Sequence, residues 1–259
     1  MTGRERLRAA LRRFSEGGGV LLGEAVGVHG VTDGLTQGVV RTPLSETATV
    51  GVAVGHALAG RRVVVELVDP QGLARATDVL ADLAGLAARS NGSFSAPIVI
   101  RAPWADVAVP AGIAVAVAGV GDDVVGLLEH ALASGKPTVI LESATALDAD
   151  AGDGAVPGLG VAVARSQGDV TVLTLGDGVA AALAVEGAEV VDLRGTTPDR
   201  AVIAASVRRT GRAVSVGAPA ALLVALQEAF LSLEAPLVAL PASAEPAAIS
   251  AAVTAALTY

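Results

Sequence analysis

The sequence predicts an α/β fold of two domains, each with a parallel β-sheet and covering helices. Short runs of aliphatic, often β-branched residues alternate with segments of helical periodicity along most of the chain, and this alternation is typical of parallel sheets with right-handed crossovers. The chain has 259 residues, of which 52% are hydrophobic and only 2% aromatic. It is therefore long enough for one large or two modest domains, with cores that consist mainly of Val, Leu, Ala and Ile.

The first half of the chain supplies the elements of the N-terminal domain. Leu7, Leu11 and Phe14 recur with helical spacing, and Gly17–Gly19 ends that helix. The apolar run 63–68 is typical of a strand that is buried on both faces. In chain order, we expect elements over residues 4–14 (helix), 20–22 (strand), 45–58 (helix), 63–68 (strand), 77–88 (helix), 97–100 and 113–117 (strands), 122–134 (helix) and 138–141 (strand).

The composition of the sequence changes at residues 144–160, which read ATALDADAGDGAVPGLG. This stretch is acidic, rich in Gly, Ala and Pro, and without periodicity, as expected of an interdomain linker. We therefore expect an N-terminal domain over 1–148, a linker over 149–160 and a C-terminal domain over 161–259. In the C-terminal domain, the same patterns predict strands over 170–175, 188–193 and 213–216, and helices over 179–185, 200–210, 222–231 and from about residue 246.

Composition and charge exclude several classes of function. The 18 basic and 26 acidic residues give a net charge of −8, which repels nucleic-acid backbones, so no nucleic-acid partner is expected. The absence of cysteine excludes disulfides and zinc sites with thiolate ligands. The N-terminus carries no apolar signal core, and the most apolar stretch, 108–120, is too short and too rich in Gly and Pro to span a bilayer. We therefore expect a cytoplasmic protein that does not bind a membrane.

Several common catalytic and cofactor motifs are missing from the sequence. It contains neither a Gly-rich phosphate loop ending in Lys-Ser/Thr nor a G-x-G-x-x-G fingerprint after a strand, and it has no G-x-S-x-G elbow. The three histidines, His29, His56 and His130, lie on separate elements without the spacing of metal ligands. Packing or surface roles are therefore favoured for them, and no metal site is predicted in this chain.

The most informative segment is 41–60, RTPLSETATVGVAVGHALAG. Pro43 ends one extended segment, Ser45 is suited to cap the helix that follows, and Glu46 falls in the first turn of that helix. The free amides and the dipole at a helix start favour a carboxylate, which is a sufficient structural reason for Glu46. The segment also resembles the start of the pyrimidine-binding domain in beta subunits of thiamine diphosphate-dependent 2-oxo acid dehydrogenases, where T-P-[IL]-S-E precedes a helix of small residues and a buried strand.

The resemblance extends in the right order along nearly the whole chain. The N-terminal segments that resemble the family's LLGED-V-G, its buried strand and its V-P-[LI]-V-I-R-x-P are LLGEAVGVHG (21–30), VVVELVD (63–69) and PIVIRAP (97–103). The segments that resemble the family's C-terminal domain are DVTVLTLG (169–176), VVDLRGTTP (190–198) and SVRRTGRAVSV (206–216). Each segment alone is a weak signal, but the ordered series is fairly specific. It implies a transketolase-like fold.

The resemblance implies thiamine diphosphate as cofactor and a catalytic role for Glu46. The counterpart of Glu46 in the family hydrogen-bonds a ring nitrogen of the cofactor's aminopyrimidine and promotes the imino tautomer, which removes the proton from the thiazolium carbon. A buried acid beside a heterocyclic nitrogen is a means of tuning a pKa. Glu24, at the family's L-G-E position, is expected to lie near the same pocket.

The resemblance also implies a partner. In thiamine diphosphate enzymes the triplet Gly-Asp-Gly opens the magnesium-diphosphate motif, which needs an Asn about one βα unit downstream. This chain has such triplets at 152–154 and 176–178, but its only asparagine, Asn91, precedes both. Magnesium and the diphosphate are therefore expected to bind an alpha-type subunit that carries the motif. Because the family's active site lies between subunits, we expect a homo- or hetero-oligomer.

The sequence departs from the family in the site itself. The family has aromatic residues after the buried strand, one of which packs on the pyrimidine, whereas Gly72 stands at that cofactor-binding position here. The lost ring contact is worth about 1–3 kcal/mol. After R-x-P the family has a Gly-rich loop and an H-S-Q-S-type segment with an active-site histidine, but here WADVAVP (104–110) leads almost directly to the next strand. Loops before Arg41 and in the C-terminal domain, of a kind that builds subunit interfaces, are also shortened.

Two hypotheses of different classes follow from these observations. In the first, the chain is the beta-type subunit of a heteromeric thiamine diphosphate enzyme, supplies Glu46, and takes part in decarboxylation of a 2-oxo acid or in ketol transfer. In the second, it is a catalytically inactive paralogue that keeps the fold as a structural or regulatory subunit, and the loss of the aromatic ring and of the histidine segment is what this hypothesis predicts. A third, an unrelated α/β binding module, requires the ordered resemblance to be accidental.

Overall fold

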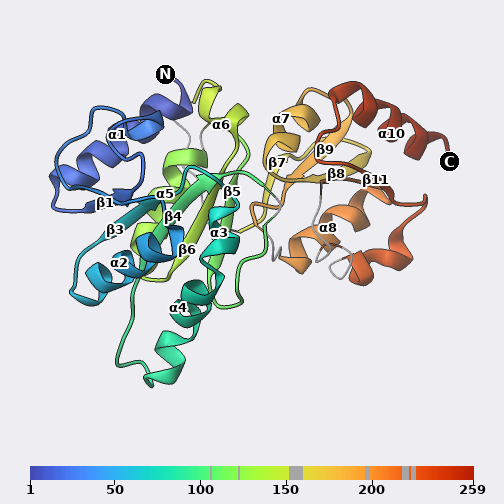
Figure 1. Cartoon of the computed structure of the whole chain (residues 1–259). Coiled ribbons are helices and arrows are strands. Elements are labelled where there is room, and N and C mark those ends of the chain that lie inside the picture. The colour runs from blue at the N-terminus through green and yellow to red at the C-terminus, as the bar shows by residue number, and fades with distance from the viewer. Residues whose placement is uncertain (106, 122, 152–159, 196–198, 218–221, 223–225) are drawn as a thin grey trace. The chain divides into compact units, whose positions relative to one another are not determined.

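The computed structural model describes residues 1–105, 107–121, 123–151, 160–195, 199–217, 222 and 226–259. These residues form two compact units, which can be followed in Figure 1. Among them, the first unit comprises residues 1–116 and 121–151, and the second comprises residues 117–120 and those from 160 onward. Most of the predicted linker over 149–160 lies outside the described residues, so the domain boundaries at 148 and 161 stay predictions.

The first unit is built on a six-stranded sheet with the strand order β2-β1-β3-β4-β6-β5, although the last two residues of β5, 117 and 118, are counted with the second unit. The strands are β1 (Val20–Gly23), β2 (Val39–Arg41), β3 (Val63–Glu66), β4 (Ile98–Pro103), β5 (Ala114–Ala118) and β6 (Thr138–Glu142). The pairs β1–β2, β1–β3, β3–β4 and β4–β6 are all parallel. The inner strands are nearly continuous aliphatic runs, because both faces of the sheet are covered and their side chains are buried on both sides.

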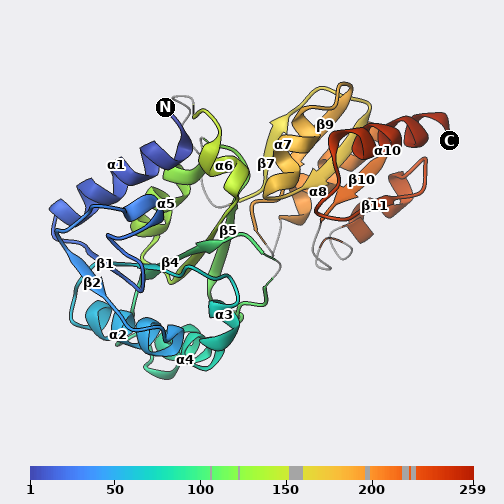
Figure 2. The same cartoon turned by 45° about the horizontal axis from the view of Figure 1, so that its top comes forward.

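Two groups of helices cover this sheet, and Figure 2 shows them on opposite faces. One group contains α1 (Gly3–Glu16), α5 (Asp123–Ser134) and the short α6 (Ala144–Asp148). The other contains α2 (Glu46–Leu58), the four-residue α3 (Gly72–Arg75) and α4 (Thr77–Arg89). The loop after β1 includes a 3-10 turn, η1 (Gly30–Thr32). In the second group, α2 lies within the segment 41–60, which contains the predicted site residue Glu46.

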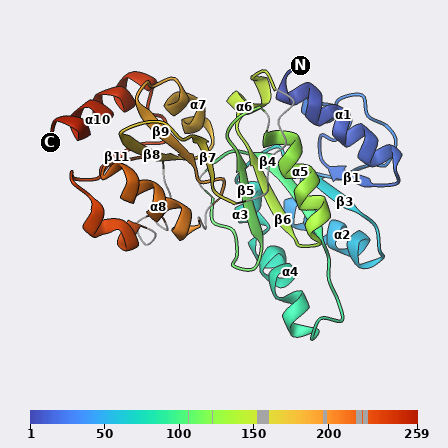
Figure 3. The same cartoon turned by 180° about the vertical axis from the view of Figure 1, so that it is seen from behind.

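The second unit contains a five-stranded sheet with the strand order β11-β10-β8-β9-β7. The strands are β7 (Ala162–Arg165), β8 (Val170–Thr174), β9 (Ala188–Asp192), β10 (Ala213–Val216) and β11 (Val238–Leu240). Its helices are α7 (Asp177–Leu183), α8 (Arg200–Thr210), the 3-10 helix η2 (Gln227–Ser232) and α10 (Pro246–Thr258). Figure 3 shows α7 and α10 on one face of this sheet and α8 on the other. Valines of β8, β9 and β10 pack with Ile249 and Val253 of α10 in the core.

The predicted α/β fold with two sheets is confirmed, with differences at the edges. One departure from the predicted parallel sheets is the edge strand β7, which pairs antiparallel with β9 through an irregular register. Where the sequence predicts a helix over 222–231, residues 227–232 form a 3-10 helix, and residues 223–225 lie outside those described. Residues 144–148, whose composition resembles that of a linker, form the helix α6. The side chain of Ser143 caps this helix by accepting a hydrogen bond from the Ala146 amide.

Three of the elements that the sequence did not predict are very short. Strands β2 and β11 have three residues each, and α3 has four. Such segments show no periodicity, so neighbouring strands and helices decide their conformation. None of the helices in the described part of the chain is long and apolar enough to cross a membrane.

Candidate functional site

Glu46 is the first residue of α2, and its neighbours explain why the helix begins there. Ser45 is the N-cap in an extended conformation, and its Oγ accepts a hydrogen bond from the Ala48 amide at 3.4 Å. The predicted cap and the place of Glu46 in the first turn are thus confirmed. Glu46 is buried, with 7% of its surface exposed. A carboxylate is therefore held at the positive end of the helix dipole, largely away from water.

Arg75, the last residue of α3, binds the Glu46 carboxylate. Its Nε and Nη2 both donate hydrogen bonds to Glu46 Oε1, and the Nε–Oε1 distance is 2.9 Å. The Oγ1 of Thr47 donates a hydrogen bond to the carbonyl oxygen of Arg75 at 2.9 Å. Two consecutive residues at the start of α2 are therefore attached to the end of α3.

The guanidinium of Arg75 is shared with a second carboxylate, that of Asp69. Nη2 lies 2.8 Å from Asp69 Oδ2, and Asp69 Oδ1 accepts a hydrogen bond from the Gln71 amide at 3.0 Å. The hydrogen bond from Arg75 lowers the pKa of Glu46, and burial opposes this in part. The same guanidinium, together with the Gln71 amide, lowers the pKa of Asp69. Arg75 thus favours the charged form of both acids.

Gly72, the first residue of α3, approaches Glu46 more closely than a residue with a side chain could. A Cβ atom at this position would lie 2.8 Å from Glu46 Cγ and 3.2 Å from Glu46 Oε1. Distances below 3 Å are not compatible with ordinary van der Waals contact, so any larger residue here must displace the Glu46 side chain. The structure thus brings together two of the three residues that the sequence predicts at the site.

Glu24, the third predicted site residue, follows directly after β1 and is partly buried. Its Oε1 is buried and has no hydrogen-bond partner among the described residues. Burial, and then the negative charge of Glu46, raise the pKa of Glu24, whereas the positive charge of Arg75 lowers it. Glu24 therefore shares one electrostatic environment with Glu46. We refer to Glu24, Glu46, Asp69, Gly72 and Arg75 as the α2–α3 cluster.

The position of the α2–α3 cluster in the sheet favours ligand binding. Glu24 and Asp69 follow the carboxyl ends of β1 and β3, which are neighbouring parallel strands. Ligands of open α/β sheets bind outside the carboxyl ends of the strands. The geometry therefore supports a site here, while the catalytic and cofactor-binding roles of its residues stay predictions.

A buried ion cluster fixes the strands and the loop beside this site. Arg101 in β4 donates from Nε and Nη2 to the two carboxylate oxygens of Glu142 (2.6 and 2.8 Å), and from Nη1 to Glu66 Oε2 (2.8 Å). Thr32 Oγ1 donates to Glu66 Oε1 at 3.0 Å and accepts a hydrogen bond from the Gly27 amide at 3.2 Å. The loop after β1 is thereby attached to three strands of the sheet.

Sequence reasoning missed both this ion cluster and Arg75. The signal for the first was a charged residue inside the otherwise apolar run PIVIRAP, together with glutamates at the ends of two other buried strands. Buried charges in such strands are retained when they are paired. For Arg75 the sequence offered no comparable signal, because α3 is too short to be predicted.

The histidines and the Gly-Asp-Gly triplets do not add a second candidate site. His29 and His130 are exposed, and His56 is half-buried on α2. The triplet at 176–178 lies at the start of α7, and the triplet at 152–154 lies outside the described residues. In the part of the chain that the structure describes, no three His, Asp or Glu side chains are arranged to hold a metal ion.

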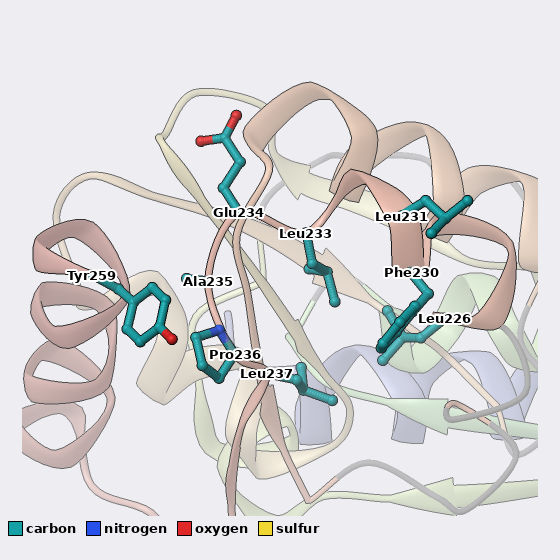
Figure 4. A pocket seen from close by; sticks show the side chains of 9 residues that line it. All are labelled: Leu226, Phe230, Leu231, Leu233, Glu234, Ala235, Pro236, Leu237 and Tyr259. Carbon is teal, nitrogen blue, oxygen red and sulfur yellow. The ribbon is translucent and has the colours of Figure 1, made fainter.

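The second unit has an apolar pocket of about 590 Å³, shown in Figure 4. Its lining residues are Leu226, Phe230, Leu231, Leu233, Glu234, Ala235, Pro236, Leu237 and Tyr259. The Glu234 carboxylate points away from the ring of Tyr259 and pairs with Arg212 at 3.1 Å. The lining therefore contains no pair of groups suited to acid–base or nucleophilic chemistry. The α2–α3 cluster is the better candidate for a reaction.

Comparison with known proteins identifies several beta subunits as relatives. No protein-family model matches the chain. It is 33% identical to the pyruvate dehydrogenase E1 component subunit beta of Leifsonia xyli, over 84% of this chain and 78% of that protein. It is 34% identical to the 3-methyl-2-oxobutanoate dehydrogenase subunit beta of Mycobacterium tuberculosis, over 84% of this chain and 76% of that protein. The pyruvate dehydrogenase E1 component subunit beta of Staphylococcus aureus is also 34% identical, with coverages of 84% and 82%.

Two solved structures resemble the chain in fold. A split-gene transketolase, described as an inactive beta4 tetramer, matches with a TM-score of 0.74 at 17% identity, over 100% of this chain and 98% of that one. A 2-oxoglutarate:ferredoxin oxidoreductase from Magnetococcus marinus matches with a TM-score of 0.63 at 11% identity, over 99% of this chain and 65% of that one. At these identities the likeness shows the fold alone, which is transketolase-like.

Proposed function

The chain belongs to the family of beta subunits of thiamine diphosphate-dependent 2-oxo acid dehydrogenases, and from this membership we propose that it is the beta-type subunit of a heteromeric enzyme acting on 2-oxo acids or ketols. In this proposal it contributes Glu46 to a cofactor pocket that is completed by an alpha-type subunit. The observation that supports it most directly is the buried carboxylate of Glu46 at the start of α2, beside the bare backbone of Gly72.

The α2–α3 cluster fits the pyrimidine end of thiamine diphosphate in its chemistry. A ring nitrogen that is to be protonated needs a carboxyl partner shielded from water, and Glu46 offers one. The amino group on the ring needs an acceptor, and Glu24 Oε1 is a buried oxygen without a partner among the described residues. Gly72 has no side chain, so on that side of Glu46 only backbone is present, whereas the Arg75 guanidinium at the other end of α3 still covers Glu46 Oε1.

Bound thiamine diphosphate supplies the carbon nucleophile and the electron sink for cleavage beside a carbonyl group. The task of Glu46 is to hold a proton between its carboxylate and the ring nitrogen. Burial helps Glu46 to hold this proton because it raises the pKa of the carboxyl group. The hydrogen bond from Arg75 has the opposite effect and lowers the pKa of Glu46. Glu24, whose pKa is raised, is suited to orient the amino group.

Magnesium and the diphosphate are assigned to the alpha-type subunit. Within the α2–α3 cluster, the basic residue is Arg75, and its guanidinium is already paired with Glu46 and Asp69. A diphosphate needs cationic or amide donors that are not engaged in this way. The proposal therefore makes a partner obligatory for catalysis, so that the active enzyme is a hetero-oligomer. We further propose that it is cytoplasmic, as expected from the sequence.

Calorimetric titration of thiamine diphosphate with magnesium tests the proposal. The protein is titrated alone and mixed with an alpha-type subunit that carries Gly-Asp-Gly and its downstream Asn. We expect binding only in the mixture, together with the circular dichroism band of the iminopyrimidine. Glu46→Gln is expected to abolish the band, whereas the matched control Glu129→Gln, which removes an exposed carboxylate of α5, is expected to keep it. A mixture that forms a complex but binds no cofactor would reject catalysis.

Two structural observations favour the second candidate, a catalytically inactive paralogue. Arg75 occupies Glu46 Oε1, and Gly72 provides no ring to pack on a pyrimidine. Under this alternative the chain still assembles with an alpha-type subunit, and Glu46 serves only to join α2 to α3. The titration above separates the two candidates, because in this case Glu46→Gln alters stability but changes neither assembly nor any cofactor signal.

A further inference from the structure

Arg75 contacts two carboxylates that differ in exposure. The side chain of Glu46 is 8% exposed and that of Asp69 is 44% exposed. The Arg75 side chain itself is 48% exposed, so it reaches the site from the solvent side. One guanidinium thus connects a buried acid with an acid at the surface.

The hydrogen bonds of Arg75 are arranged so that it can leave one acid and keep the other. Nε and Nη2 both donate to the same oxygen of Glu46, Oε1, while Nη2 also lies 2.8 Å from Asp69 Oδ2. The Arg75 carbonyl oxygen stays attached to Thr47 Oγ1. Release of Glu46 therefore requires rotation of one long, half-exposed side chain and no movement of the backbone.

We propose that Arg75 is a positioning residue that gates Glu46: its guanidinium holds Glu46 Oε1 in the absence of cofactor and moves onto Asp69 when the aminopyrimidine takes its place. This inference rests on the proposed function and deepens it. A ligand gains access to Glu46 only if it offers a hydrogen-bond donor where Nε and Nη2 now stand. The ring nitrogen of the aminopyrimidine meets this condition when a proton lies between it and Glu46.

The charged residues around α2 that lie outside the α2–α3 cluster do not pair with Glu46. The charged residues of β3, β4 and α4 are paired with one another or exposed at the surface: Glu66 with Arg101, Asp82 with Arg89, and Asp78 in solvent. Glu24 and Asp69 are the groups that oppose a negative charge on Glu46. Removal of the Arg75 charge therefore leaves Glu46 beside two acids, which disfavours its charged form.

The first test measures the Arg75–Glu46 contact in the full chain without cofactor. Carbon-13 NMR of the side-chain carboxyl groups follows the titration of Glu46, which is assigned with Glu46→Gln. In Arg75→Gln we expect the proton affinity of Glu46 to rise about tenfold, because a neutral amide replaces the guanidinium. The matched control Arg89→Gln removes an arginine of α4 that pairs with Asp82 and leaves the titration unchanged. An unchanged Glu46 titration in Arg75→Gln overturns the proposal.

The second test measures the affinity of the assembled complex for thiamine diphosphate with magnesium by calorimetry. Arg75→Gln removes the competitor for Glu46 and is expected to tighten binding about tenfold. Asp69→Asn removes the charge that receives Arg75 and is expected to weaken binding several-fold. A purely structural role of Arg75 predicts weaker binding in both variants, so the opposite signs are specific to the gate. Arg89→Gln again serves as the control.

The two tests distinguish failure of this inference from failure of the proposed function. If the complex forms but neither it nor any variant binds the cofactor, the proposed function is wrong, whatever the titration of Glu46 shows. If the wild-type complex, Arg75→Gln and Asp69→Asn bind the cofactor equally well, the function stands and the gate is wrong. Tighter binding in Arg75→Gln with weaker binding in Asp69→Asn supports both.

Discussion

The backbone of Gly72 lies so close to Glu46 that a Cβ atom on it would stand 2.8 Å from Glu46 Cγ. Gly72 begins α3 and Arg75 ends it, so the same short helix brings a bare backbone and a guanidinium to one carboxylate. The two features depend on each other: a larger residue at position 72 would push Glu46 away from the place where Arg75 now binds it. The glycine is therefore a structural requirement of the Arg75–Glu46 pair.

Gly72→Ala tests this dependence. The added methyl group must displace the Glu46 side chain, and we expect the free energy of unfolding to fall by about 1–2 kcal/mol. The matched control is Gly55→Ala in α2, where an added Cβ would meet no atom within 4 Å and the backbone is helical. There we expect a gain of about 0.5–1 kcal/mol, since alanine favours the helix. Urea unfolding measures the free energy of unfolding of both variants. A decrease in both variants, or in neither, would contradict the dependence of the Arg75–Glu46 pair on Gly72.

Glu24→Gln is expected to stabilise the protein at neutral pH and to have little effect at low pH. The pKa of Glu24 is raised by burial and by Glu46, so its ionised form is disfavoured in the folded state. Below the ordinary glutamate pKa, Glu24 is protonated in both the folded and the unfolded state and does not reduce the free energy of unfolding. As the pH rises through the raised pKa, Glu24 must ionise in the folded protein, and the free energy of unfolding falls. Removing the charge should recover this loss, which we expect to be under about 1 kcal/mol because Glu24 is only partly buried. Thermal unfolding at pH 4 and pH 7 checks the sign, and an equal change in unfolding temperature at both would count against it.

Glu46→Gln is expected to have the opposite pH dependence. The pKa of Glu46 is lowered, chiefly by the hydrogen bond from Arg75, so its charged form contributes stability above the ordinary glutamate pKa. That contribution is lost as the pH falls through the lowered value. We expect Glu46→Gln to reduce the free energy of unfolding by about 1 kcal/mol at pH 7, since the exposed Arg75 is screened by solvent. The difference from wild type should vanish in strong acid. A constant difference across the titration would show that the amide disturbs packing instead.

The start of α2, with Ser45 and Glu46, could be predicted from the sequence because it depends on residues that are close together in the chain. Ser45 caps α2 through the amide three positions later, and Glu46 takes its place from that cap. The burial of β3 likewise follows from a local run of valines. These features need no knowledge of the rest of the chain, since hydrogen bonding and hydrophobic periodicity operate within one turn or one strand.

The remainder of the site depends on contacts between distant residues, which sequence patterns do not report. Arg75 and Glu46 are 29 positions apart, and Arg101 and Glu142 are 41 positions apart. The first pair joins the helices α2 and α3, and the second joins the neighbouring strands β4 and β6, so both depend on the tertiary arrangement of these elements. The antiparallel edge strand β7 escaped prediction for a related reason. Two of its four residues are half-buried and two are exposed, so they carry no strong pattern, and pairing with β9 decides their conformation.

Arg101→Met is expected to cause the largest loss of stability among these variants. The Arg101 side chain is 3% exposed and pairs with Glu142 and Glu66, whose side chains are 7% and 14% exposed. Methionine is also unbranched, but it is shorter and leaves two carboxylates without their cation, which costs about 3–5 kcal/mol.

Arg13→Met is the control, because Arg13 pairs at the surface with the exposed Glu129 and its loss should change the free energy of unfolding by less than about 0.5 kcal/mol. Adding Glu66→Gln and Glu142→Gln to Arg101→Met should recover part of the loss, since the uncompensated charges are then removed. Urea unfolding followed by circular dichroism compares the four proteins. If Arg101→Met costs no more than Arg13→Met, the buried ion cluster does not hold the loop after β1 in place, and the support it gives to Glu24 must come from the packing of that loop.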